Sequence, residues 1–222
     1  MILLLVIPAT LIWSLRFENR GYYIASVLLI LYTMIPFFLG FERRKPQARE
    51  LVVVAVMCAL AVASRTLFIW IPHFKPMTAI IIVTGVALGA EAGFLTGAVS
   101  GFVSNFIFGQ GPWTPWQMFA YAVAGLLAGW LCRKGHIKST PVSLSIFGGL
   151  LVMLVVGPLL DTSTLFTMVS SVTWESAAAI YLSGIPINAI HALATVLTLY
   201  LFSRPLLEKL NRAKVKYGMM EG

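Results

Sequence analysis

The sequence carries little charge, and this scarcity restricts the class of protein it can be. Only 11% of its 222 residues are charged and 59% are hydrophobic, whereas a soluble domain carries roughly 25% charged residues. So few charges cannot cover a surface that faces water. The apolar residues form continuous runs of about 20 rather than alternating with polar ones, which indicates helices that span a bilayer. We therefore predict an all-α polytopic membrane protein.

Cysteines and common catalytic motifs are also scarce. The two cysteines, Cys58 and Cys132, lie in or at the end of apolar runs and indicate neither a disulfide framework nor a metal site. No Walker A sequence, no His-Glu-x-x-His and no Gly-x-Ser-x-Gly motif is present. The sequence predicts no ATP hydrolysis by this chain, no resident metal or cofactor, and no enzymatic activity.

Positive charge is present, but it is gathered in a few places. The net charge is +8, and most basic residues fall in three stretches that flank apolar runs, at 43–49, 133–138 and 204–216. Such clusters are typical of the cytoplasmic ends of membrane helices and argue against nucleic acid as a partner. We predict a multi-pass protein of the cell membrane whose basic loops and C-terminus are cytoplasmic.

Eight apolar segments can be read along the chain, and a polar break at 42–50 divides them. We expect an N-terminal two-helix extension over 1–41, a six-helix module over 42–205 and a basic cytoplasmic tail over 206–222. The apolar segments are 2–15, 22–41, 49–71, 76–90, 92–108, 115–132, 142–160 and 180–203.

The order of basic and neutral connections predicts an orientation. If 43–49 is cytoplasmic, the connections at 72–75, 109–114 and 161–179 lie outside, and the other basic stretches lie inside. This holds only if 76–108 contains two short helices that turn near Glu91.

Small residues recur at every fourth position in four of the segments, which lets helices approach closely in lipid. A glycine series predicts helix packing, with sliding between helices as the functional alternative. An alanine series in 49–71 fits either ordinary packing or docking of another membrane subunit. The series are Gly85, Gly89, Gly93, Gly97 and Gly101; Gly125 and Gly129; and Ala55, Ala59 and Ala63.

The stretch 105–118 concentrates Gly, Pro, Trp and neutral amides between two apolar segments. Its prolines and glycines fix a defined loop, so Trp113 and Trp116 could line a pocket, although tryptophans also anchor helices at the membrane surface. Trp174 in the next outer connection has the same two interpretations.

Few polar side chains lie within the apolar segments. Asn188 and His191 are one helical turn apart and share a face, so they could bind a ligand or satisfy another helix. Arg65 lies near the end of its segment and could reach either a pocket or the membrane surface.

With these features, the chain resembles the substrate-binding S component of energy-coupling factor (ECF) vitamin transporters. The six-helix plan, the alanine series and the Trp-rich outer loop carry the resemblance. The stretches 105–118 and 184–192 look most like the cobalamin-type branch, whereas the extension over 1–41 departs from the six-helix plan.

The resemblance implies a protein that binds a vitamin from outside and works with a transmembrane coupling subunit and two cytoplasmic ATPases, which bind the ATP. It implies docking of the coupling subunit on Ala55, Ala59 and Ala63. We expect cobalamin or a related corrinoid as substrate, with riboflavin or a queuosine-type precursor as alternatives. An intramembrane enzyme and a purely structural protein are the rival classes. The expected substrate-binding residues are Gln110, Trp113, Trp116, Gln117, Tyr121, Trp174, Asn188 and His191.

Overall fold

The computed structural model describes residues 21–43, 46–169 and 172–218, and these ranges contain helices and no β-strand. Within them, three helical stretches are long and apolar enough to cross a membrane: Ala48–Leu67, Pro141–Met168 and Trp174–Tyr217. The shorter helix Met77–Leu88 is also apolar. The predicted all-α membrane fold is therefore confirmed. The helix expected over 2–15 lies outside the described residues.

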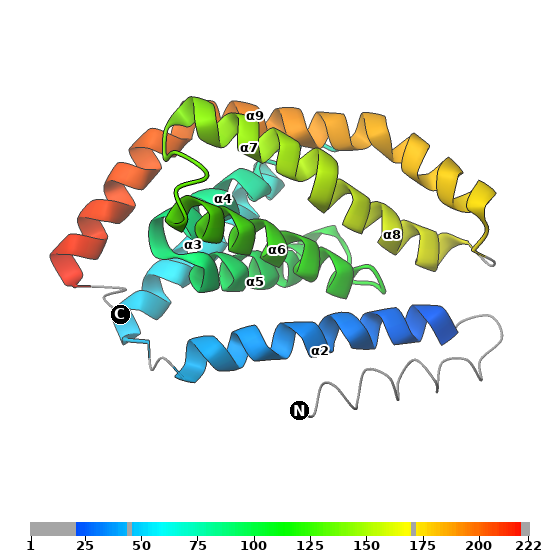
Figure 1. Ribbon diagram of the computed structural model, residues 1–222, viewed down its shortest axis with the longest axis horizontal. Helices are drawn as coiled ribbons and strands as arrows, with labels where there is room; N and C mark the ends of the chain where they lie inside the picture. Colours follow the sequence, from blue (N-terminus) through cyan, green and yellow to red (C-terminus); the bar gives the residue numbers. More distant parts are fainter. Residues whose placement is uncertain (1–20, 44–45, 170–171, 219–222) are drawn as a thin grey trace.

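The helices pack beside one another as a bundle (Figure 1). α7, the short π-helical turn η1 and α8 form one continuous stretch. The elements are α2 (Gly21–Arg43), α3 (Ala48–Leu67), α4 (Met77–Leu88), α5 (Ala90–Phe108), α6 (Thr114–Arg133), α7 (Pro141–Leu151), η1 (Val152–Val156), α8 (Gly157–Met168) and α9 (Trp174–Tyr217).

A glycine separates α4 from α5, as the orientation argument requires. Gly89 has a φ of 98°, a conformation that residues with a side chain rarely adopt. The chain therefore reverses there, two residues before Glu91, and α4 and α5 form separate short helices. The predicted turn near Glu91 is confirmed.

The glycine series brings the backbones of α5 and α6 into contact. A Cβ added at Gly97 would lie 2.2 Å from the carbonyl oxygen of Tyr121, and one added at Gly125 would lie 2.1 Å from that of Gly93. No side chain fits at these positions, so the glycines serve packing of α5 on α6.

The connection expected over 161–179 is wrong, because most of it is helical. α8 continues to Met168 and α9 begins at Trp174. The threonines of α8 satisfy their hydroxyls within the helix, since Thr162 donates to the carbonyl of Pro158 over 2.7 Å and Thr167 to that of Ser163 over 2.8 Å. A polar stretch can thus remain helical at the end of a membrane helix.

The ends of two other segments also differ from expectation. α3 ends at Leu67 rather than at 71, and Trp70 in the following turns is 90% exposed. α9 continues through the expected tail to Tyr217 and contains Pro186 and Pro205. In Figure 1 its last part, in red, bends away from the rest and approaches the start of α3.

The helix α2 packs against the bundle along the side opposite α9 (Figure 1). Its Met34 is 2% exposed, and the Phe37 ring stacks on that of Phe94 in α5 with centroids 4.2 Å apart. α2 is therefore joined to the rest of the bundle through an apolar interface.

Candidate functional site

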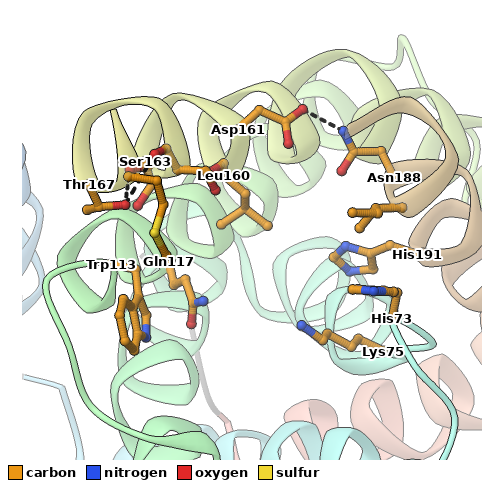
Figure 2. Close-up of a pocket in the computed structure, with 13 residues that line it drawn as sticks. His73, Lys75, Trp113, Gln117, Leu160, Asp161, Ser163, Thr167, Asn188 and His191 are labelled. Carbon is orange, nitrogen blue, oxygen red and sulfur yellow. Dashed lines mark hydrogen bonds between the residues drawn. The ribbon is translucent and has the colours of Figure 1, made fainter. Parts of the chain in front are cut away.

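A cavity of about 400 Å³ lies at one end of the bundle, where the connection between α3 and α4 meets α6, α8 and α9 (Figure 2). This is the end that the charge pattern predicts to face outward. Its lining residues are His73, Lys75, Trp113, Gln117, Leu160, Asp161, Ser163, Thr164, Thr167, Met168, Ile187, Asn188 and His191.

His191 is held by residues of two other helices. Its ring is 4% exposed, and Nε2 lies 2.9 Å from Oγ1 of Thr78 at the start of α4. The ring of Tyr121 in α6 meets it edge-on, with centroids 6.3 Å apart. His191 therefore faces the cavity in a fixed orientation, with one ring nitrogen already bonded.

Asn188 binds a carboxylate on the neighbouring helix. Its Nδ2 donates to Oδ2 of Asp161 over 2.8 Å, a bond drawn in Figure 2. Two glycines make room for this pair. A Cβ at Gly157 would lie 2.5 Å from Cγ of Asn188, and one at Gly184 would lie 2.4 Å from Oδ2 of Asp161. The pair fixes α8 against α9 beside the cavity.

The loop before α6 is held by hydrogen bonds around one hydroxyl. Thr114 Oγ1 accepts from Nδ2 of Asn105 over 3.1 Å and donates to Oε1 of Gln110 over 2.9 Å. The backbone N–H of Gly111 also donates to it over 3.2 Å. This network sets where α6 begins and thereby positions Trp113 and Gln117 at the cavity.

Two polar atoms of the cavity lining have no hydrogen-bond partner in the described part of the chain. They are Oγ of Ser163, a residue that is only 3% exposed, and Oε1 of Gln117. Buried polar groups without a partner cost free energy, and they are rare in folded proteins. Both atoms can bond to a molecule bound in the cavity.

A buried cation lies behind the cavity. Arg65 of α3 is 3% exposed; it donates from Nη1 to Ser104 and, over 3.1 Å, to Oδ1 of Asn105. Its guanidinium also lies 4.2 Å from the centre of the Phe108 ring. Of the two positions open to Arg65 in the sequence, the structure shows the interior one, although Arg65 does not itself line the cavity.

Four of the eight residues expected to bind substrate line the cavity, namely Trp113, Gln117, Asn188 and His191. The other four lie elsewhere. Gln110 bonds to Thr114 and to the carbonyl of Phe102, Tyr121 is buried behind His191, Trp116 packs on Phe166, and Trp174 is 92% exposed at the start of α9. A role in binding stays a prediction for all eight.

None of the residues expected to bind substrate lies on α8, because the sequence predicts a connection rather than a helix over 161–179. α8 in fact contributes Asp161, Ser163 and Thr167 to the cavity. The polar run from Asp161 to Thr164, interpreted as the end of a helix, would indicate Asp161 and Ser163.

The alanine series lies on the surface of the bundle. Ala55, Ala59 and Ala63 are exposed, whereas Ala61 on the opposite face of α3 is fully buried. An exposed row of small side chains fits docking of another helix better than packing within this chain.

Within the described residues, no group of three or more His, Cys, Asp and Glu side chains could hold a metal ion. Both cysteines are free. The polar residues of the cavity are amides, hydroxyls, imidazoles, one ammonium and one carboxylate, a set suited to binding an organic molecule.

Comparison with known proteins identifies one family. The family described as "ECF-type riboflavin transporter, S component" matches residues 45–208, which cover α3 to most of α9. No curated protein and no solved structure matches the chain.

Proposed function

Because the chain belongs to the family of ECF-type riboflavin transporter S components, we propose that it captures a riboflavin-like vitamin in the cavity between α6, α8 and α9. The family consists of transporter components rather than enzymes, and its members work with an ECF membrane subunit and ATPases. In this proposal the chain supplies substrate recognition, and the partner subunits bind ATP.

The size of the cavity is the observation that carries this choice of substrate. Its volume of about 400 Å³ lies at the low end of ligand pockets, which span roughly 300–1,000 Å³. A three-ring heterocycle with a short polar chain is of this size, whereas a corrinoid with its macrocycle and nucleotide loop is several times larger. The volume therefore favours riboflavin, one of the sequence-based alternatives, over cobalamin.

The chemistry of the cavity supports the same class of ligand. The indole of Trp113 lies on one side of the cavity and offers a flat surface on which a ring system can stack (Figure 2). The unpartnered Oε1 of Gln117 accepts hydrogen bonds, and Oγ of Ser163 can donate or accept them. A heterocycle edged with amide groups, or a hydroxylated chain, would satisfy both atoms.

The docking of the coupling subunit is proposed on α3. The exposed Ala55, Ala59 and Ala63 leave the backbone of α3 accessible to a partner helix. Basic clusters at the opposite end of the bundle from the cavity support a cytoplasmic position for the C-terminus, which leaves the cavity open to the outside.

Binding of riboflavin to the purified, substrate-free protein tests the proposal. Free riboflavin is fluorescent, so stacking on Trp113 should quench its emission, and calorimetry gives the affinity. We expect tight binding that Trp113→Ala weakens at least tenfold, a loss of about 1.4 kcal/mol. Trp70→Ala is the control, since that side chain is 90% exposed and lies outside the cavity lining.

The same measurement with cobalamin separates the two substrates. Binding of cobalamin without binding of riboflavin would contradict the choice of substrate and leave the family unchanged. If the wild-type protein and Trp113→Ala bound riboflavin with equal affinity, the ligand would lie away from Trp113.

A further inference from the structure

Lys75 places an unpaired ammonium group at the cavity. Its side chain is half-buried, and in Figure 2 it points across the cavity toward the side that holds Gln117. Within the described residues, Lys75 makes no hydrogen bond, ion pair or ring contact. The side chain is thus not used to hold the fold, and its charge is available to a ligand.

The titratable groups around Lys75 come from several neighbouring elements. His73 lies on the same connection, His191 on α9, Arg65 on α3, and Asp161 is across the cavity on α8. Asp161 is already bonded to Asn188 and forms no ion pair with Lys75 in the described structure. The end of the cavity next to Lys75 is therefore rich in basic groups.

The pKa of Lys75 reflects this environment. Burial, with the positive charge of Arg65 as the second cause, lowers the pKa of Lys75 to about 8. At neutral pH the ammonium form still predominates, although burial and repulsion from Arg65 both destabilise it. A negatively charged group beside it would relieve both.

The backbone next to Lys75 is also unusual. His73 has a φ of 61°, which makes it the one non-glycine residue with positive φ in the described part of the chain. Such conformations are uncommon and often accompany functional sites. Here the turn brings both His73 and Lys75 to the cavity.

We propose that the substrate carries an anionic substituent, such as a phosphate ester, that binds beside Lys75. This inference rests on the proposed function, because it assigns one part of the same cavity. The ring system would lie against Trp113 and Gln117, and the anionic end would face the basic side formed by Lys75 and His73. The chain would then prefer a charged vitamin derivative over its neutral parent.

Riboflavin and riboflavin 5′-phosphate test this, because they differ only in the phosphate. We expect the phosphate ester to bind the wild-type protein about tenfold more tightly or better, the range for a hydrogen bond between charged groups. Lys75→Gln should remove most of this difference, because it should lower the affinity for the phosphate ester far more than the affinity for riboflavin. Lys209→Gln, an exposed lysine far along α9, is the matched control and should change neither affinity.

The dependence on pH gives a second readout. Since Lys75 is protonated below its pKa of about 8, the preference for the phosphate ester should be full near pH 6.5–7 and decline as the pH rises beyond 8. A bound anion raises the pKa of the ammonium, so the decline should be centred above 8. Lys75→Arg should keep the preference and lose this pH dependence, because arginine stays charged.

The outcomes separate the two levels of the proposal. Equal affinities for the two flavins, or an equal loss of both in Lys75→Gln, would overturn the anionic subsite while leaving the proposed function in place. Failure of both flavins to bind would overturn the proposed function and the subsite together.

Discussion

Asn188 Nδ2 donates a 2.8 Å hydrogen bond to Oδ2 of Asp161, and this bond links α9 to α8 beside the cavity. Both residues line the cavity, so the bond orients part of its surface as well as joining two helices. Gly157 and Gly184 make the contact possible, because a Cβ at either position would overlap the partner's side chain. The geometry of the site thus depends on positions that carry no functional group themselves.

Removing the donor of this bond should weaken both folding and binding. In Asn188→Leu the Asp161 carboxylate loses its partner in a half-buried position, at a cost of about 1–3 kcal/mol in the free energy of unfolding. Thermal unfolding in detergent and the affinity for riboflavin measure the two effects. Ser183→Ala, which removes an exposed hydroxyl bonded only within α9, should change neither; equal effects in both variants would contradict the assigned role.

Filling the space next to Asp161 should displace the carboxylate without changing its charge. A Cβ in Gly184→Ala would lie 2.4 Å from Oδ2 of Asp161, so the side chain or the helix must shift, at a cost of about 1–3 kcal/mol. We expect a reduced affinity and a lower unfolding temperature. Unchanged affinity would show that the position of Asp161 does not matter to the ligand.

The bond between Thr78 and His191 should stabilise the bundle across α4 and α9. Thr78→Val keeps the shape of the side chain but removes the partner of Nε2, which leaves a buried imidazole nitrogen unsatisfied. The expected loss is about 1–3 kcal/mol in the free energy of unfolding. Thr198→Val is the control, since that hydroxyl bonds only to the carbonyl of Ala194 in its own helix; it should cost clearly less.

The contact between α5 and α6 should tolerate no side chain at Gly97. An alanine there would place Cβ 2.2 Å from the carbonyl oxygen of Tyr121, which forces the helices apart and should lower stability by about 1–3 kcal/mol or more. Gly40→Ala in α2 is the matched control, because no atom lies within 4 Å of its added Cβ. Alanine also favours a helix over glycine, so this variant should be neutral or more stable. Equal stability of the two variants would argue against close backbone packing.

Docking of the coupling subunit on α3 should be blocked by a large side chain at Ala59. Since Ala59 is exposed, Ala59→Trp should leave folding and vitamin binding intact while the ECF membrane subunit and the ATPases no longer co-purify. Ala189→Trp, at an exposed position on α9, should retain the complex. If the complex survives in Ala59→Trp, the alanine series is not part of the docking surface.

Several features of the fold follow from local sequence. Continuous apolar runs predict membrane helices because lipid leaves no partner for an unpaired backbone group. The glycine spacing predicts where helices approach, and Gly89 ends α4 because it adopts a positive φ. The polar end of α8 was missed because an Asp-Thr-Ser-Thr run is typical of loops, and only its internal hydroxyl bonds and its neighbours keep it helical.

The sequence by itself determined that the chain is a helical membrane protein with a structured Trp-rich loop and few polar side chains within its apolar segments. Only the tertiary structure decided which side chains share the cavity. Gln117 faces it, whereas Trp116 points toward Phe166, because successive residues of a helix are rotated by about 100°. His191 meets Thr78 across 113 residues of chain, and such a contact depends on how helices pack, which local spacing does not encode.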